Sequence, residues 1–600
     1  MPRDLAAARE RLKTVFGYDD FRPGQGEIVA ATLAGEAVLA VMPTGSGKSM
    51  CFQLPAIVEN ALTVVVSPLI ALMRDQVQQM QAVGVSAAAL NSQNTAPENA
   101  RIFESLRAGA LNLLYVAPER LLMEGCIDEL RSARPRRLAI DEAHCVSEWG
   151  HDFRPEYRKL GRVAAAFGAP VIALTATAGK TTRDDIVDRL FSAPPRVFLH
   201  SFDRPNLEMS FAAKKRPVRQ LLQFLERRED ESGIIYCASR RRTESLAAEF
   251  RAAGFDALPY HAGMDHAARM RNQDRFLRED RVVVCATIAF GMGVNKPDVR
   301  FVAHADMPSS IESYYQEIGR AGRDGLPAEA FTLYGLEDMA FRRRQIDEKG
   351  FPEERARIEH ARFSAMALLC ESPRCRRQTL LAYFDEASQP CGRCDHCAGK
   401  IKMRDGTIEA QKALSATMRT GQCFGAGYLA DLLIGEESAA VRRNGHAALK
   451  TFGVGKEHSR KTWMAIVRQL FAAGALKVAS GEYGGFALTE HGRAILYGQE
   501  KFSLREDLVA APPRRSAALA SAPREEQVEG PLLAALKQTR REVAAREGVP
   551  VFMIFPDRTL IDMAAKRPKT LGELRDVYGV GERKLAAYGG VFFDALSKAE

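Results

Sequence analysis

The chain has 600 residues, 46% hydrophobic and 26% charged, which is typical of a globular protein with several domains. Its net charge of +9, from 84 basic and 75 acidic residues, permits binding to nucleic acid without requiring it. Residues 1–13 lack an apolar signal core, and no run is long enough to span a membrane, so we expect a soluble cytosolic protein. The eleven cysteines are an odd number, which argues against a disulfide-stabilised secreted protein.

The first segment with a chemical signature is the loop VMPTGSGKSM at residues 41–50, between an apolar run at 37–40 and a segment at 51–58 that can form a helix. Backbone N–H groups of such a loop can surround a polyphosphate. Lys48 would then reach the β- and γ-phosphates, and the Ser49 hydroxyl would bind Mg²⁺. Met42 stands where the strict pattern has its first glycine, so this loop alone leaves both a nucleotide site and an ordinary turn open.

An acidic motif, DEAH at residues 141–144, follows a predicted apolar strand at 138–140. An acidic residue at the end of a strand parallel to the one that leads into the phosphate loop lies where Mg²⁺ needs a second ligand, and Asp141 fits this role. Glu142 would orient and deprotonate the attacking water. A solvated turn is the alternative for DEAH alone, but its place after a strand and downstream of the phosphate loop favours a catalytic site.

Short apolar or β-branched runs alternate with helical segments through the first half of the chain, as expected for parallel strands covered on both faces. We predict an α/β fold with two tandem doubly wound lobes and a bend near 201–205. Polar motifs at the strand ends, such as Thr175 to Thr177 and residues 316–323, lie where open parallel sheets bind ligands. The predicted strands are 62–66, 111–116, 138–140 and 171–175 in the first lobe, and 233–238, 281–287 and 300–305 in the second.

The motifs of the chain together resemble those of the RecQ family of superfamily 2 DNA helicases, over nearly the whole length. The resemblance implies two RecA-like lobes (1–202, ATP-binding, and 203–340), a helical zinc-binding module (341–405), a winged helix (406–500), a linker (501–529) and a small helical HRDC-like domain (530–600). The motifs are FGYDDFRPGQ (16–25), MPTGSGKS (42–49), SPLIALMRDQV (67–77), YVAPERL (115–121), DEAHCVSEWGHDFRPEY (141–157), LTATA (174–178), FDRPNL (202–207), YHAGM (260–264), AFGMGVNKPDVRFV (289–302) and QEIGRAGRDG (316–325).

The resemblance also implies an activity: ATP-driven, 3′-to-5′ translocation on single-stranded DNA that unwinds duplex, forked or branched DNA in recombination, repair and replication-fork maintenance. Its cofactors would be ATP, Mg²⁺ and Zn²⁺. Its partners would be DNA, a single-strand-binding protein and recombination factors, with no membrane, and it would be a cytoplasmic, nucleoid-associated bacterial protein. Two alternatives stay open: an RNA helicase with the same core, and a DNA-binding scaffold whose motor has decayed.

Residue roles in the motor follow from the resemblance. Tyr18 would stack on the base, although core packing is its alternative, and Arg22 and Gln25 would read the adenine edge. Arg323 would reach the γ-phosphate from the second lobe with support from Arg320, a surface ion pair being the alternative for either. Thr175 and Thr177 would link the ATP state to lobe closure. The loop residues assigned to the phosphates are Thr44, Gly45, Gly47, Lys48 and Ser49.

The aromatic segment after DEAH carries Trp149, Phe153 and Arg154, and Trp149 is one of two tryptophans in the chain. By resemblance this segment contacts single-stranded DNA and couples it to ATP hydrolysis. Stacking of a base on an aromatic side chain contributes about 1–3 kcal/mol. Hydrophobic packing beneath a loop is the alternative.

A zinc site is predicted from four cysteines that follow the motor, spaced C-x15-C-x2-C-x2-C, because four thiolates in an intracellular protein form a closed, structural Zn²⁺ site. The ligands are Cys375, Cys391, Cys394 and Cys397. Cys370 and His396 are less favoured ligands, and a redox dithiol is the alternative function. Cys375 is preferred because the two arginines that follow it resemble the family pattern.

The last third is expected to bind DNA through a winged helix. The segment at 459–474 predicts a helix capped by Ser459 and ended by Gly474, with a wing hairpin at 477–489. Arg460, Lys461 and Arg468 could face phosphates or be solvated charges. In the HRDC-like domain, the N–H groups of Gly579 and Gly581 could also contact a phosphate.

Overall fold

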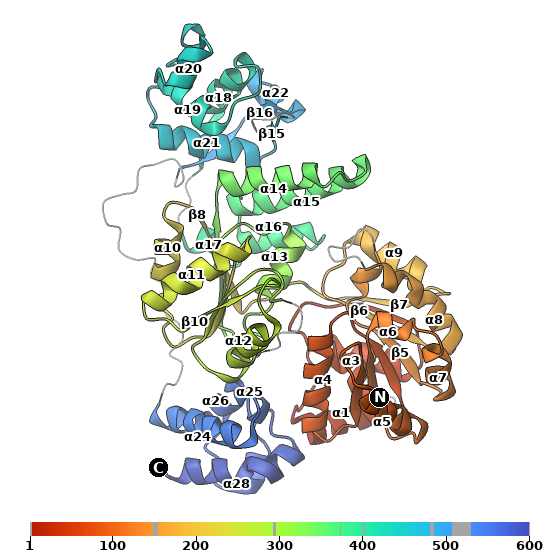
Figure 1. The fold of residues 1–600 in the computed structure, drawn as a ribbon. Coiled ribbons are helices and arrows are strands. Elements are labelled where there is room, and N and C mark those ends of the chain that lie inside the picture. The colour runs from red at the N-terminus through yellow and green to blue at the C-terminus, as the bar shows by residue number, and fades with distance from the viewer. Residues whose placement is uncertain are drawn as a thin grey trace.

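The computed structural model describes residues 3–147, 154–291, 296–372, 374–399, 403–479, 485–506 and 530–598. Figure 1 shows two α/β lobes beside each other, with a helical module and a winged helix stacked on the second lobe at the top. The C-terminal helical domain, in blue, lies at the opposite end of the molecule, beneath the second lobe and next to the first. The predicted α/β class with two tandem lobes and three further modules is confirmed.

The first lobe is built on a seven-stranded sheet in the order β3-β4-β2-β5-β6-β1-β7, in which all neighbouring strands are parallel. Side chains alternate between the two faces of each strand, so that Val38 and Ala40 of β1 join one core cluster and Leu39 and Val41 join another. The strands are β1 (Val38–Val41), β2 (Thr63–Val66), β3 (Ala87–Leu90), β4 (Leu113–Val116), β5 (Arg137–Ile140), β6 (Val171–Thr175) and β7 (Arg196–Leu199).

Helices cover both faces of this sheet, which explains why its strands are mostly apolar. The helices are α1 (Arg3–Phe16), α2 (Gln25–Leu33), α3 (Met50–Glu59), α4 (Ile70–Ala82), α5 (Ala96–Arg107), α6 (Pro118–Leu121), α7 (Cys126–Ser132), α8 (Leu160–Phe167) and α9 (Lys180–Leu190), with short 3₁₀ turns η1 (Ala143–Val146) and η2 (Pro155–Lys159).

The second lobe repeats this architecture with a six-stranded parallel sheet in the order β10-β11-β9-β12-β13-β8. Its strands are β8 (Leu207–Ala213), β9 (Gly233–Tyr236), β10 (Ala257–Tyr260), β11 (Val283–Ala286), β12 (Phe301–His304) and β13 (Ala328–Tyr334), and its helices are α10 (Pro217–Leu225), α11 (Arg240–Ala252), α12 (His266–Arg278) and α13 (Ile311–Ile318).

A helical module follows, with α14 (Leu336–Glu348), α15 (Glu353–Glu371), α16 (Arg376–Tyr383) and α17 (Asp395–Ala398). It leads into the winged helix, whose elements are β14 (Met403–Asp405), α18 (Thr407–Arg419), α19 (Ala426–Ile434), α20 (Ala439–Arg443), η3 (His446–Ala448), α21 (Arg460–Ala472), β15 (Leu476–Val478), β16 (Phe486–Leu488), α22 (Glu490–Leu496) and β17 (Ser503–Arg505).

Two predictions about the winged helix are confirmed and one boundary is wrong. Ser459 caps α21 by accepting a hydrogen bond from Thr462 N at 3.2 Å, and β15 pairs antiparallel with β16 as a wing. Residues 503–505, predicted to belong to a flexible linker, instead form β17 and pair with β14. Burial of Leu504 against Gly406 supplies the apolar contact that fixes this strand. The rest of the predicted linker, 507–529, lies outside the described residues.

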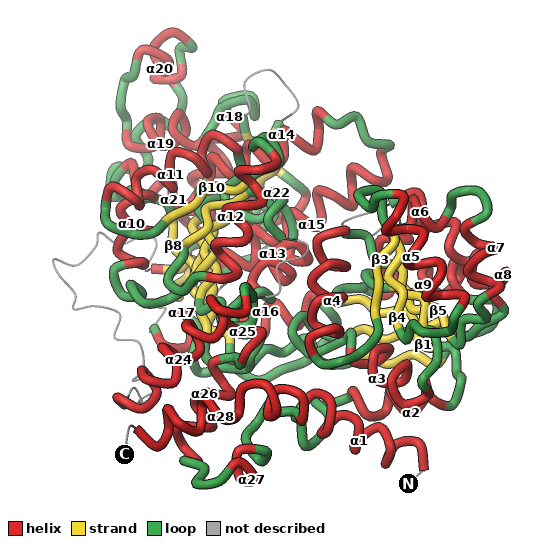
Figure 2. Tube along the Cα trace, turned by 60° about the horizontal axis from the view of Figure 1, so that its bottom comes forward, coloured by secondary structure: helices red, strands yellow, loops and turns green. Residues whose placement is uncertain are grey.

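The C-terminal domain is an all-helical unit with its own core, formed by α24 (Pro531–Glu547), α25 (Val551–Ile554), α26 (Asp557–Lys566), α27 (Leu571–Leu574) and α28 (Glu582–Lys598). Figure 2 shows α28 near α1, and residues of the two helices are in contact, whereas the N and C ends of the chain lie apart. Within the described part of the chain, no helix combines the length and the apolar character that a membrane span needs.

Candidate active site

A cavity of about 810 Å³ between the lobes collects most of the residues predicted to bind nucleotide. It is lined from both lobes and also from the C-terminal domain. The predicted residues that line it are Tyr18, Arg22, Gln25, Thr44, Gly45, Gly47, Lys48, Ser49, Asp141, Glu142 and Arg323.

The phosphate loop joins the carboxyl end of β1 to α3, where a parallel sheet presents its ligand-binding edge. Gly45 and Gly47 both have φ of 81°, in the left-handed region that favours glycine. Lys48 Nζ donates to the Met42 carbonyl at 3.4 Å, and burial lowers the pKa of Lys48. A buried ammonium group at this position would be stabilised by an anionic phosphate.

Met42, the residue that departs from the strict loop pattern, lies in the core and has no need for glycine's freedom. Its side chain is fully buried, and its backbone N–H donates to Thr175 O at 3.0 Å, which extends the pairing of β1 with β6. Its φ is not among the positive values of the described chain. The substitution therefore leaves the phosphate-binding part of the loop unchanged.

Arg22 and Gln25 contact the phosphate loop. Gln25 Nε2 donates to Ser46 O at 2.9 Å and to Gly47 O at 3.0 Å, and Arg22 Nη1 donates to Gly45 O. Both side chains therefore hold the loop in shape from the same cavity wall. Reading of the adenine edge by Arg22 and Gln25 stays a prediction.

Two oxygen donors suited to Mg²⁺ flank the loop. Ser49 Oγ accepts from Gln76 Nε2 at 2.9 Å, which orients the hydroxyl, and Asp141 follows β5 at the same edge of the sheet. Burial raises the pKa of Asp141 to about 7, with the Glu142 carboxylate adding to the rise and Lys48 opposing it. A bound divalent cation would offset this destabilisation, so the donor chemistry of Ser49 and Asp141 fits a Mg²⁺ site.

A chain of polar contacts connects Glu142 to the second lobe. His144 Nδ1 lies 3.4 Å from Glu142 Oε2 and 2.9 Å from Thr175 Oγ1. Thr175 Oγ1 is 3.3 Å from Thr177 O, and Gln316 Nε2 from α13 donates to Thr177 Oγ1 at 3.4 Å. The contacts therefore run from the second lobe to Glu142, the predicted base, through two threonines. The predicted role of these threonines in linking the ATP state to lobe closure stays a prediction.

Arg323 comes from the second lobe and reaches the phosphate loop of the first. A Cβ atom placed on Gly45 would lie 3.5 Å from Arg323 Cγ. Burial, together with the positive charges of Arg320 and Arg204, lowers the pKa of Arg323 to about 10. Arg320 is 8% exposed and packs against Gly291, and it is not among the residues that line the cavity. A cluster of guanidinium groups beside an anion-binding loop matches the negative charge of a triphosphate.

Arg204 belongs to the motif FDRPNL in the segment that joins the lobes and lines the cavity, although the motif alone predicts no role for it. Its Nη1 donates to Thr44 O of the phosphate loop at 2.5 Å. Its Nη2 donates at 3.0 Å to both Ala321 O and Gly322 O, directly before Arg323. One guanidinium thus ties the phosphate loop to the loop that carries the arginine of the other lobe.

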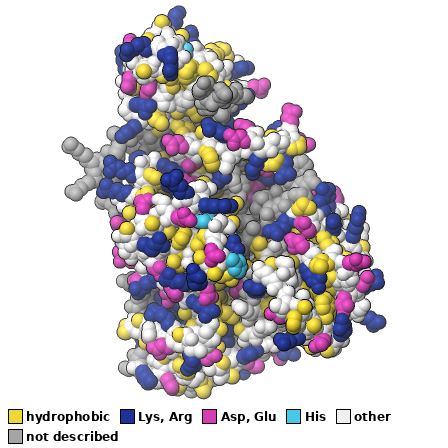
Figure 3. Space-filling view, viewed as in Figure 1, with side chains coloured by type: hydrophobic (Ala, Val, Ile, Leu, Met, Phe, Trp, Pro, Cys, Tyr) yellow, Lys and Arg dark blue, Asp and Glu magenta, His cyan; other side chains and the backbone are white. Residues whose placement is uncertain are grey.

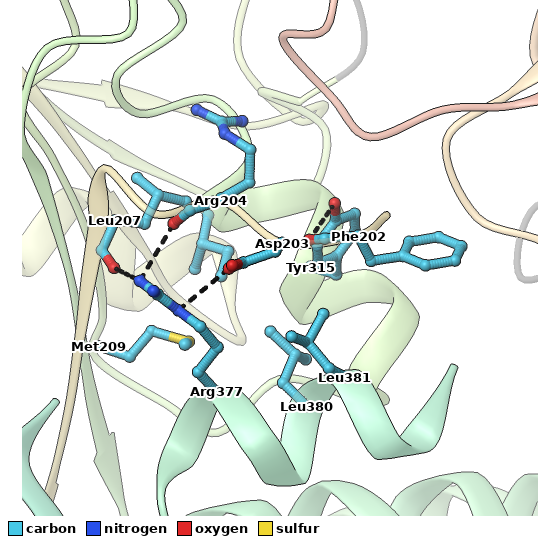
Figure 4. Close-up of a pocket in the computed structure, with 10 residues that line it drawn as sticks. Phe202, Asp203, Arg204, Leu207, Met209, Tyr315, Arg377, Leu380 and Leu381 are labelled. Atoms are coloured by element: carbon cyan, nitrogen blue, oxygen red, sulfur yellow. Dashed lines mark hydrogen bonds and ion pairs between the residues drawn. The ribbon is translucent and has the colours of Figure 1, made fainter. Parts of the chain in front are cut away.

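The helical module holds this joining segment in place, as Figure 4 shows. Arg377 of α16 points into it and donates from Nη2 to Leu207 O at 3.0 Å and to Arg204 O at 3.3 Å. Its Nε lies 3.2 Å from Asp203 Oδ1. The bend between the lobes therefore rests on the module that carries the four predicted zinc ligands.

These four cysteines come together in space. The Sγ atoms of Cys375, Cys391, Cys394 and Cys397 all lie within 4.8 Å of one another. Cys394 Sγ is 3.8 Å from Cys375 Sγ, and Cys391 Sγ is 4.0 Å from Cys397 Sγ. Zn–S bonds of about 2.3 Å in a tetrahedron separate the sulfurs by about 3.8 Å, so the donor set fits a structural Zn²⁺ ion.

Comparison with protein families matches each part of the chain in order. The matches are DEAD/DEAH box helicase (22–186), helicase conserved C-terminal domain (214–325), RecQ zinc-binding (336–398), RQC domain (400–512) and HRDC domain (529–596). The ATP-dependent DNA helicase RecQ of Haemophilus influenzae is 43% identical, over 98% of this chain and 95% of its own. The chain belongs to the RecQ family. The RecQ proteins of Pasteurella multocida (42% identity, 98% of this chain and 94% of its own) and Bacillus subtilis (35%, 99% and 98%) are also similar over nearly their full lengths.

The aromatic segment after DEAH is described only at its edges. Trp149 and Phe153 lie outside the described residues. Arg154 donates from Nη1 to Pro68 O at 2.8 Å, beside the motif SPLIALMRDQV. The role of these three residues in coupling DNA to ATP hydrolysis stays a prediction.

Two basic side chains of the winged helix that could face phosphates form ion pairs within the protein. Arg468 pairs with Glu371 of α15, so it joins the winged helix to the zinc module and does not face phosphates as expected. Arg460 is half-exposed and pairs with Asp431 Oδ1 at 2.5 Å. Figure 3 shows Lys and Arg side chains interspersed with Asp and Glu over the visible face, in keeping with the modest net charge.

The HRDC-like domain faces the motor. Gly579 N donates to Gly17 O at 2.8 Å, so this N–H is used within the protein and the phosphate contact predicted for Gly579 is wrong in this arrangement. A phosphate contact by the N–H of Gly581 stays a prediction. Residues of this domain also line the nucleotide cavity, which no sequence motif indicated. They are Phe552, Met553, Pro556, Arg558, Tyr578, Gly579 and Lys584.

Proposed function

We propose that this protein is an ATP-driven DNA helicase that moves 3′ to 5′ on single-stranded DNA and unwinds duplex or branched DNA in recombination, repair and replication-fork maintenance. The observation that supports this most is the composition of one cavity. It combines Lys48 and the acidic pair Asp141 and Glu142 from the first lobe with Arg323 from the second.

In this proposal Lys48 and Arg323 bind the phosphates from opposite lobes, so that ATP favours a closed cleft and its hydrolysis permits opening. Glu142 accepts a proton from the attacking water. Ser49 and Asp141 would hold Mg²⁺, which would supply positive charge to the reacting phosphate. Repeated closure moves a DNA strand that lies across both lobes.

The remaining assignments complete the proposal. Tyr18, Arg22 and Gln25 form the base side of the nucleotide site, and Arg320 supports Arg323. Trp149, Phe153 and Arg154 sense single-stranded DNA. Zn²⁺ on the four cysteines is structural. A single-strand-binding protein and recombination factors are the proposed partners, and the nucleoid of a bacterial cytoplasm is the proposed location.

The direct test measures unwinding of 3′-tailed, 5′-tailed and forked duplexes of DNA and of RNA with ATP and Mg²⁺. We expect unwinding of the 3′-tailed and forked DNA and none of the RNA. Equal activity on RNA would favour the RNA-helicase alternative. ATP turnover that does not rise with single-stranded DNA would favour a scaffold with an inactive motor.

Substitution Glu142→Gln tests the assigned base. We expect ATP and DNA binding to remain close to wild type while turnover falls by about 10²–10⁴-fold, which is the contribution of a positioned general base. Steady-state ATPase assays with saturating single-stranded DNA measure this change. The matched control, Glu124→Gln, alters an exposed glutamate of the same lobe and should leave turnover unchanged. Near-normal hydrolysis by Glu142→Gln would remove Glu142 from the mechanism.

A further inference from the structure

The C-terminal domain bridges the two lobes across the nucleotide cavity. On the first lobe, Gly579 N donates to Gly17 O at 2.8 Å and Arg583 Nη1 donates to Gln81 O at 3.0 Å. On the second lobe, Arg278 Nη1 donates to Gly548 O at 2.7 Å. The domain therefore contacts both bodies whose relative movement the motor requires.

The contact at Gly17 is too close for any other residue. Gly17 has φ of 72°, and a Cβ atom there would lie 2.5 Å from Val580 N. On the other side, a Cβ atom on Gly581 would lie 2.7 Å from Val15 O. Two glycines thus permit the backbones of the first lobe and the C-terminal domain to meet.

This close approach places Tyr578 against Tyr18, the predicted base-stacking residue. The ring centroids are 5.2 Å apart with the planes inclined at 38°. On the Tyr578 ring, the Arg558 guanidinium lies 4.1 Å from the centroid, and Arg558 also approaches Gly325 of the second lobe. Tyr578 N donates to Asp562 Oδ2 at 2.7 Å, which anchors the backbone that carries the ring. The position of Tyr578 is therefore fixed from both sides.

A nucleotide base cannot fit between these two rings as they stand. Insertion of a flat base needs about 7 Å between the ring planes, because each contact takes about 3.5 Å. The centroid separation is 5.2 Å. Stacking of a base on this face of Tyr18 therefore requires Tyr578 to move away.

We propose that the C-terminal domain gates the nucleotide site, with Tyr578 occupying the face of Tyr18 on which the base of ATP stacks. This inference rests on the proposed function, since it assigns Tyr18 to the base. The docked domain and the bound base exclude each other at Tyr18. ATP binding then releases the bridge between the lobes. Because only undocked molecules can bind the base, the apparent Kd for ATP equals the intrinsic Kd divided by the fraction of undocked molecules.

The test measures the Kd of a fluorescent ATP analogue for the full-length chain with Mg²⁺ and without DNA. Tyr578→Ala removes the competing ring, and we expect the Kd to fall about two- to tenfold, the range that an aromatic pair contributes. Gly581→Ala leaves Tyr578 in place but prevents the backbone contact, and its Kd should fall as well. Tyr497→Ala, at a 65% exposed tyrosine of the winged helix, is the matched control and should not change the Kd.

Inorganic tripolyphosphate separates the base from the phosphates. Because it has no base, its inhibition constant should be the same for wild type and Tyr578→Ala. An unchanged ATP Kd in both variants would overturn the gate. A weaker Kd in Tyr578→Ala would also overturn it, since Tyr578 would then be part of the base site. A wild-type chain that binds no ATP would instead reject the proposed function.

Discussion

Substitution Arg323→Ala is expected to lower kcat for ATP hydrolysis by about 10³–10⁵-fold, the contribution of an arginine that reaches the transferred phosphate from another domain. The reason is geometric: Arg323 belongs to the second lobe, yet it lies against Gly45 of the phosphate loop. Its charge can stabilise the transition state only when the lobes are close. ATP binding should change much less, because Lys48 and the loop amides remain.

Stability separates this effect from simple unfolding. Burial, followed by the charges of Arg320 and Arg204, lowers the pKa of Arg323, so its removal relieves both the desolvation of a charge and the repulsion within the cluster. We therefore expect the thermal midpoint of Arg323→Ala to equal or exceed that of wild type. Arg323→Lys should recover part of the activity only, because lysine keeps the charge but lacks the planar fork.

The matched control for this prediction is Arg281→Ala, an exposed arginine of the same lobe that pairs with Asp230 at 3.0 Å. Exposed pairs of this kind contribute about 0–1 kcal/mol, and turnover should be unchanged. Stopped-flow and steady-state ATPase assays with single-stranded DNA provide the comparison. A kcat within threefold of wild type for Arg323→Ala would place the arginine outside the reaction.

Several strands that are buried on both faces could be predicted from sequence, whereas the alanine-rich strand β3 and the exposed edge strand β7 could not. The runs at 62–66 and 171–175 became β2 and β6 because unbroken β-branched and apolar residues require cover on both faces. β3 has the sequence AAAL, and alanine has little preference for strands. β7 lies at the edge of the sheet with three of its four residues exposed, so it lacks an apolar signal.

Some residues of the candidate site could likewise be predicted from sequence, and others could not. Lys48, Asp141 and Glu142 could be predicted because each lies within a few residues of a strand end, where the chemistry is local. Arg204 could not be assigned, because its partners Thr44 and Gly322 are distant in the sequence and are backbone carbonyls that leave no residue-type signal. Tyr578 became part of the cavity only through docking of a separate domain.

Loss of one zinc ligand should lower both the stability of the zinc module and ATP turnover, so its effect should extend beyond that module. Structural zinc supplies about 10–16 kcal/mol of apparent binding free energy in small domains. Asp395, next to the predicted ligand Cys394, connects the module to the second lobe. It accepts from Arg376 Nε at 2.8 Å and from the backbone N of Phe211 in β8 at 3.0 Å. Glu386 accepts from Phe202 N at 2.8 Å, at the bend between the lobes.

We therefore expect Cys394→Ser to abolish the one bound zinc, to lower the thermal midpoint of the module and to reduce ATP turnover, although its side chain lies outside the nucleotide cavity. The reduction arises because Arg377 of the same module positions the segment that carries Arg204. Atomic absorption, thermal unfolding and ATPase assays on the same preparations measure the three changes. Chelation of wild-type protein should reproduce all of them.

Two cysteine controls separate zinc binding from the general effect of replacing a thiol. Cys423→Ser alters an exposed cysteine of the winged helix and should retain one zinc and full turnover. Cys370→Ser alters a buried thiol outside the four-sulfur cluster, so it should retain the zinc even if packing around it loosens. Retention of one zinc and of the wild-type midpoint by Cys394→Ser would contradict the assigned site. Loss of zinc with unchanged turnover would instead contradict the link from the module through Arg377 to the ATP site.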